Sequence, residues 1–194
     1  MAEFLNIVGT AAGLVAIAEV GDKTQLLSIM LAARFRKPWP IIAGVLVATL
    51  ANHAVAAWAG AALSQWFAGP AFRIAVGLGF LATALWVLVP DKIDDEEPAT
   101  REGFLGGVFL TTAIAFFVAE IGDKTQVATV GLGAQFHNVA AVTIGTTLGM
   151  MIANVPAIFL GDRVLRVVPM AAVRAVAALV MAGLGALMLW QTLR

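Results

Sequence analysis

The sequence contains no cysteine and no tyrosine, and it is poor in charged residues. Without cysteine, disulfides, zinc fingers, iron–sulfur clusters and thiol catalysis are excluded. Without tyrosine, aromatic anchoring at a membrane surface depends on the five tryptophans. Charged residues make up 12% of the chain and their charges sum to zero, so nucleic acid is not an expected partner.

Most of the sequence is apolar. Hydrophobic residues make up 61% of the 194 positions, and the mean hydropathy is +0.93. A soluble domain is usually about half apolar and about one quarter charged. Apolar runs of about 20 residues predict membrane-spanning helices, and six such runs occur, at roughly 4–31, 40–63, 71–90, 103–133, 139–160 and 170–193. We therefore expect an all-α membrane protein with six transmembrane helices and the lipid bilayer as its surroundings.

The first and fourth runs are longer than a bilayer requires, and charged residues lie in the middle of both. These residues are Glu19, Asp22, Lys23, Glu120, Asp123 and Lys124. A charge in the membrane core costs about 3 kcal/mol on insertion scales, so it is paired, hydrated or functional. The charges and the central glycine of each run predict that both helices break or distort there.

An octapeptide occurs twice. Ala-Glu-Val-Gly-Asp-Lys-Thr-Gln at residues 18–25 returns 101 positions later, at 119–126, with isoleucine in place of valine. Each copy lies in a half with three predicted spans, and an odd number of spans reverses the second half in the membrane. We therefore predict two inverted-topology three-helix repeats, residues 1–90 and 103–194, joined by an acidic cytoplasmic loop at 91–102. Such repeats place a transport site between them near the midplane.

Two converging copies would gather four carboxylates and two ammonium groups. The two remaining negative charges match one divalent cation, and oxygen ligands without cysteine favour Mg²⁺, Ca²⁺ or Mn²⁺. Further candidate ligands are Thr24, Gln25, Asn52, Thr125, Gln126 and Asn154, with the two asparagines corresponding approximately, one position off the repeat. Lys23 and Lys124 are predicted either to balance the charge of the empty site or to form salt bridges away from the pathway.

Clustered carboxylates cannot all remain ionised once the cation leaves, so cation release is predicted to be coupled to proton uptake, as in an antiporter. A purely structural role for the lysine pairs is the alternative, although buried ion pairs stabilise poorly for their cost. An intramembrane enzyme and a channel are further alternatives; the charged set has no obvious nucleophile. His53 is interpreted as a hydrogen-bonded interior histidine, with a proton relay as the alternative.

Two copies of Glu-x-Gly-Asp-Lys-Thr, at 19–24 and 120–125, resemble the signature of the transmembrane protein 165 family of cation transporters. The resemblance covers the whole chain and is nearest to the bacterial manganese exporters. It implies export of Mn²⁺ from the cytoplasm, with Ca²⁺ as the alternative ion, in exchange for H⁺. It also implies a transporter with no enzymatic activity and no resident cofactor. By position, the implied cation ligands are Glu19, Asp22, Glu120 and Asp123.

Lysine and arginine between the spans predict the orientation. One side carries Arg34, Arg36, Lys37, Lys92, Arg101, Arg163, Arg166 and Arg174, and the other carries Arg73 and Arg194. The richer side is expected to be cytoplasmic. Both termini would then lie outside, across a cytoplasmic membrane of bacterial type. The sequence does not fix the oligomeric state, and a homo-oligomer is compatible with it.

The acidic run at residues 94–97 is interpreted as a solvated linker. Replacing Asp94 and Asp95 together by asparagine is expected to change transport only mildly, measured as Mn²⁺ flux in proteoliposomes. A severe loss of flux would instead assign this loop a part in cation handling.

Overall fold

The computed structural model describes residues 1–67, 69–89, 107–161 and 169–194, and every regular element in these ranges is an α-helix. The helices are α1 (Ala2–Glu19), α2 (Lys23–Phe35), α3 (Pro38–Trp66), α4 (Pro70–Val87), α5 (Gly107–Glu120), α6 (Lys124–Phe136), α7 (Val139–Leu160) and α9 (Met170–Leu193). The predicted all-α class is confirmed. The acidic loop at 91–102 lies outside the described residues.

The first and fourth apolar runs are each divided into two helices at the repeated motif. Gly21 and Gly122 occupy the turns with φ of +79° and +75°, a left-handed conformation that glycine adopts without steric cost. The Oε1 atom of Gln25 accepts a hydrogen bond from the Gly21 amide at 2.8 Å. Gln126 does the same for Gly122 at 2.7 Å. The predicted break is therefore confirmed, and both copies build it with the same glycine turn and the same glutamine hydrogen bond.

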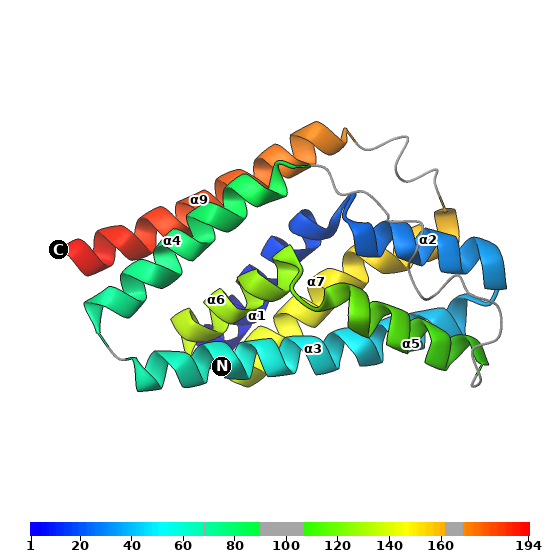
Figure 1. The fold of residues 1–194 in the computed structure, drawn as a ribbon, viewed down its shortest axis with the longest axis horizontal. Coiled ribbons are helices and arrows are strands. Elements are labelled where there is room, and N and C mark those ends of the chain that lie inside the picture. The colour runs from blue at the N-terminus through cyan, green and yellow to red at the C-terminus, as the bar shows by residue number, and fades with distance from the viewer. Residues whose placement is uncertain (68, 90–106, 162–168) are drawn as a thin grey trace.

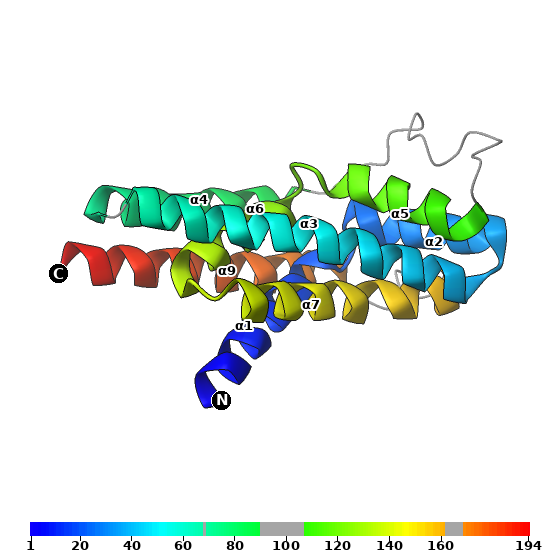
Figure 2. The ribbon, with the colours of Figure 1, turned by 90° about the horizontal axis from the view of Figure 1, so that it is seen from below.

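The two halves run in opposite directions along the long axis of the molecule. Figure 1 shows α1 followed by α2 from left to right and α5 followed by α6 from right to left. The pairs α3 and α7, and α4 and α9, are likewise antiparallel to one another, and Figure 2 shows the same elongated bundle from below. Helices α2 and α6 begin and end at equivalent repeat positions.

The helices of one half pack mainly against helices of the other half. In the described part of the chain, α1 packs on α7, α3 on α5 and α6, and α4 on α9, whereas the contacts of α2 with α3 and of α6 with α7 are smaller. The halves are therefore intertwined, and each depends on the other for its core.

Equivalent glycines allow two of these crossings. A Cβ atom on Gly44 of α3 would lie 2.8 Å from the Phe109 carbonyl oxygen of α5. A Cβ atom on Gly145 of α7 would lie 2.6 Å from the Val8 carbonyl oxygen of α1. Gly145 lies 101 positions after Gly44, and Phe109 lies 101 positions after Val8, so the two contacts are repeat equivalents. Small residues let helix backbones approach closely in a membrane, and the repeat preserves that contact.

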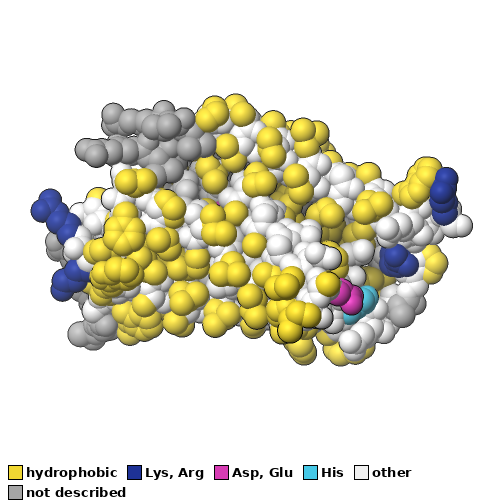
Figure 3. Space-filling model, turned by 180° about the vertical axis from the view of Figure 1, so that it is seen from behind, with side chains coloured by type: hydrophobic (Ala, Val, Ile, Leu, Met, Phe, Trp, Pro, Cys, Tyr) yellow, Lys and Arg dark blue, Asp and Glu magenta, His cyan; other side chains and the backbone are white. Residues whose placement is uncertain are grey.

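The outer surface is that of a membrane protein. Five helices, α1, α3, α4, α7 and α9, are long and apolar enough to cross a bilayer, and α5 is apolar but shorter. Figure 3 shows one lateral face covered by hydrophobic side chains, with lysine and arginine at its two ends. Trp39 and Trp66, at the two ends of α3, are largely exposed, as expected of residues that anchor a helix at the membrane surface.

Substituting Gly145 by alanine is expected to lower the free energy of unfolding by about 1–3 kcal/mol, because the added methyl group meets the α1 backbone. The matched control is Gly13→Ala on α1, where no neighbouring atom lies within 4 Å; it should be neutral or stabilising by up to about 1 kcal/mol. Unfolding of both purified variants in detergent tests this order, and equal stabilities would contradict the close crossing.

Candidate cation site

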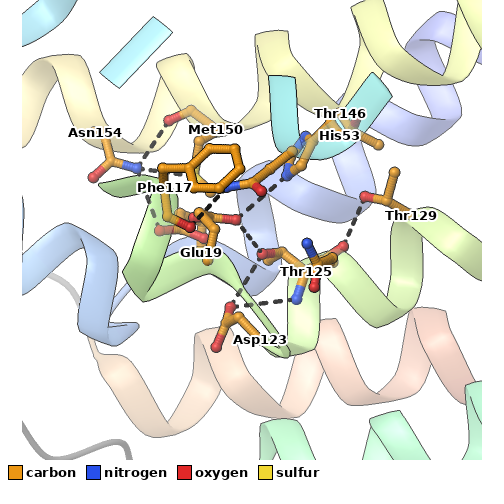
Figure 4. A network of polar contacts seen from close by, with 12 residues as sticks. Glu19, His53, Phe117, Asp123, Thr125, Thr129, Thr146, Met150 and Asn154 are labelled. Atoms are coloured by element: carbon orange, nitrogen blue, oxygen red, sulfur yellow. Dashed lines mark hydrogen bonds and ion pairs between the residues drawn. The ribbon is translucent and has the colours of Figure 1, made fainter. Parts of the chain in front are cut away.

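The two breaks meet near the middle of the molecule (Figure 1). There the C-terminal ends of α1 and α5 carry Glu19 and Glu120, and the residues before α2 and α6 are Asp22 and Asp123. Figure 4 shows the resulting network of polar side chains, enclosed by helices of both halves. The site is thus built from the ends of interrupted helices, where backbone groups are left without partners in the helix.

Three of the four motif carboxylates form one buried group. Glu19, Asp22 and Asp123 each offer an oxygen, and these oxygens all lie within 4.8 Å of one another. The three side chains belong to both repeats and are buried. Oxygens that bind one Ca²⁺ at about 2.3–2.6 Å can be at most about 4.6–5.2 Å apart. The observed spacing is therefore close to that of a cation site.

Glu120, the fourth carboxylate, has different neighbours. Its Oε2 atom lies 3.5 Å from Nε2 of His53, and the Thr125 hydroxyl donates a hydrogen bond to the same oxygen at 3.5 Å. Glu120 and His53 are both completely buried. The structure therefore places this carboxylate beside a histidine and outside the group of three.

Glu19 occupies the equivalent position in the first half, and its partner is Asn154. The Nδ2 atom of Asn154 donates to Glu19 Oε1 at 3.3 Å, while its Oδ1 accepts from the Ser28 hydroxyl at 2.6 Å. Asn154 lies 101 positions after His53, so the two partners are repeat equivalents. Each half thus supplies the side chain that holds the other half's glutamate.

This arrangement corrects the approximate pairing of Asn154 with Asn52. The side chain of Asn52 instead donates to the Phe117 carbonyl oxygen at 3.0 Å. Because the Asn154 amide group faces Glu19 and its oxygen faces Ser28, Asn154 positions a candidate ligand here and does not present its oxygen to the group of three. The signal that sequence reasoning missed was the strict offset of 101 residues, which selects His53 over its neighbour.

Two ion pairs cross between the repeats. Lys124 Nζ lies 3.2 Å from Asp22 Oδ1, and Lys23 Nζ lies 3.5 Å from Asp123 Oδ1. Each lysine therefore pairs with the aspartate of the other motif. The lysines differ in environment, since the side chain of Lys23 is 28% exposed and that of Lys124 is 4% exposed.

The remaining candidate ligands divide into two kinds. The side-chain oxygens of Gln25 and Gln126 accept hydrogen bonds from the glycine amides of the breaks. The Thr125 hydroxyl carries one hydrogen, which it can donate either to Asp123 Oδ2 at 3.1 Å or to Glu120 Oε2 at 3.5 Å. By contrast, Thr24 Oγ1 and Glu19 Oε2 are buried and make no hydrogen bond within the described part of the chain. Unsatisfied buried oxygens are costly, and a bound cation would satisfy them.

Comparison with known proteins agrees with this chemistry. Residues 7–95 and 108–194 match the family described as "Divalent cation/proton antiporter GDT1". A Vibrio cholerae serotype O1 protein named "Putative manganese exporter" is 46% identical over 175 residues, covering 90% of this chain and 86% of that protein. A Synechocystis protein named "GDT1-like protein sll0615" is 28% identical over 169 residues, covering 76% of this chain and 79% of that protein. No solved structure matches.

The equivalence of His53 and Asn154 predicts an order of stabilities. His53→Leu leaves the buried Glu120 carboxylate without its neighbour and is expected to cost about 1–3 kcal/mol of unfolding free energy. His53→Asn introduces the residue that the second half uses at this position and should cost less. Thermal unfolding of the purified variants measures the order, which a fully stable His53→Leu protein would contradict.

Proposed function

The chain belongs to the GDT1 family of divalent cation/proton antiporters, and on that premise we propose that it exports Mn²⁺ from the cytoplasm in exchange for H⁺. Family membership confirms the resemblance suggested by the two Glu-x-Gly-Asp-Lys-Thr motifs. The chain is therefore an integral membrane protein that transports cations. Because the family is one of transporters, the alternative of an intramembrane enzyme is set aside.

One observation carries the proposal: three buried carboxylates from both repeats offer oxygens within 4.8 Å of one another, a spacing that fits a single ion. We assign Glu19, Asp22 and Asp123 as the ligands, with the unpaired Glu19 Oε2 and Thr24 Oγ1 among the available oxygens. Glu120 belongs to the same site but is held by His53 and Thr125. Its other oxygen, Oε1, is buried and makes no hydrogen bond within the described residues.

Alternating access around this site is the proposed mechanism. Its basis is the opposite direction of the two halves and the position of both breaks near the middle of the long axis (Figure 1). Two three-span halves of inverted topology would exchange conformations to open the site first to one side and then to the other. Interrupted helices suit such a site because their ends supply polar groups at membrane depth.

Proton exchange follows from charge balance at the site. A divalent ion that leaves three carboxylates removes two positive charges from an environment that solvates charge poorly. Protons that bind the two motif carboxylates that are not paired with a motif lysine, Glu19 and Glu120, restore the balance and allow the site to return. The family description names the proton as the exchanged ion, and the buried pair of Glu120 and His53 lies next to the ligands, where a proton could also reside.

The choice of Mn²⁺ rests on the name of the 46% identical Vibrio cholerae relative. Oxygen ligands alone also suit Ca²⁺, so Ca²⁺/H⁺ exchange is the alternative that direct competition tests. The direction rests on basic residues: Arg34, Arg36 and Lys37 lie where α2 meets α3, at the end of the molecule opposite Arg73 and Arg194. Lys92, Arg101, Arg163 and Arg166 lie outside the described residues.

Replacing Glu19 by glutamine or Asp123 by asparagine is expected to reduce Mn²⁺ transport to background, because each change removes one of three carboxylates. Transport is measured in proteoliposomes with Mn²⁺, Ca²⁺ and Mg²⁺ in competition, with and without a pH gradient. The exposed Glu3→Gln is the matched control and should transport like the unmodified protein.

Full activity in either site variant would overturn the ligand assignment. Flux that ignores the pH gradient would overturn proton exchange, and preference for Ca²⁺ over Mn²⁺ would favour the alternative ion.

A further inference from the structure

The ion pairs between the repeats occupy the same carboxylates that a transported cation needs. Lys124 Nζ lies 3.2 Å from Asp22 Oδ1, and Lys23 Nζ lies 3.5 Å from Asp123 Oδ1. Both aspartates belong to the group of three. In the described conformation, two of the three candidate ligands are therefore already neutralised by ammonium groups of the protein itself.

Lys124 is the more deeply buried of the two lysines. Its side chain is 4% exposed and contacts an aspartate that is also buried, whereas the side chain of Lys23 is 28% exposed. Exposure to solvent weakens the attraction between Lys23 and Asp123, whereas burial strengthens the attraction between Lys124 and Asp22. The repeat therefore supplies two lysines, but the salt bridge of Lys124 is stronger than that of Lys23 because it is more deeply buried.

Lys124 also has a second acceptor within reach. Its ammonium group lies 3.4 Å from the carbonyl oxygen of Val89, just beyond the end of α4. A lysine is a compact charge on a flexible four-carbon stem, so a small change of rotamers can transfer it from one oxygen to another. Lys124 can thus release Asp22 without losing every hydrogen-bond acceptor.

We propose that Lys124 is a tethered cation that holds Asp22 in the empty transporter and is displaced by the transported ion. This inference rests on the proposed function, since it concerns the same site. In this role Lys124 lowers the affinity for the cation, which favours release, and keeps the carboxylates neutralised while no ion is bound. Lys23 acts in the same way on Asp123, but more weakly.

The competing interpretation is that Lys124 forms a permanent salt bridge that only joins the two halves. The two interpretations predict opposite changes in cation affinity when the lysine is removed. If Lys124 competes with the ion, removing its charge tightens cation binding. If it only holds the site together, removing it disorganises the carboxylates and weakens binding. The sign of the change therefore separates the two roles.

The experiment is equilibrium Mn²⁺ binding to the purified full-length protein, comparing Lys124→Met, Lys124→Arg and Lys23→Met. Lys124→Met keeps most of the apolar stem and should bind Mn²⁺ about tenfold more tightly or better, since it removes a nearby like charge. Lys124→Arg keeps the charge and should stay within about threefold of the unmodified protein. Lys23→Met should gain only about two- to threefold, because its charge is partly hydrated.

Unchanged or weaker binding by Lys124→Met overturns the proposal. Lys124→Gln repeats the test if the methionine variant does not remain monodisperse. If both neutral variants fail to fold while Lys124→Arg folds, the lysine is a structural tie and the proposal is also overturned. The proposed function is tested separately, because it fails if the unmodified protein does not bind Mn²⁺ or if Glu19→Gln binds it equally well.

Discussion

Charge that is buried away from water must find a partner within the protein, and this constraint explains the centre of the structure. Six charged side chains come from two octapeptides in the middle of apolar segments. No single helix could neutralise its own set, because each octapeptide carries two carboxylates and only one ammonium group. Breaking each helix at a glycine turns the two sets of charges toward each other, and every ion pair observed among them joins the two halves. The fold is arranged around that exchange of partners.

Much of this arrangement could be predicted from the sequence. The last two apolar runs, 139–160 and 170–193, coincide with α7 and α9, because breakers and polar residues delimit them sharply. The interruption of the first and fourth runs followed from their length and their central charges. The repeat indicated that two acidic motifs would meet, and the structure brings together Glu19, Asp22 and Asp123.

The partners of these residues could not be predicted, because sequence spacing describes neighbours only within a continuous helix. Lys23 follows Glu19 by four positions, a spacing that pairs side chains on an unbroken helix. The break between them removes that relation, and Lys23 contacts Asp123 instead. The separate environment of Glu120 likewise depends on His53, which lies on α3 and far away in the sequence. Such contacts are set by how the halves pack, and local patterns do not report packing.

The intertwined packing of the halves also has a consequence for biosynthesis. Translation delivers Glu19 and Asp22 to the membrane before the ribosome has made Asp123 and Lys124, which lie about a hundred residues further on. Asn154, the partner of Glu19, follows 135 residues after it. At roughly 5–20 residues per second, the delay before Asp123 and Lys124 is about 5–20 s. During that interval the nascent first half must keep its acidic segment hydrated, inside the insertion machinery or at the membrane surface. The first half can therefore complete its insertion into the bilayer only after the second half has been synthesised.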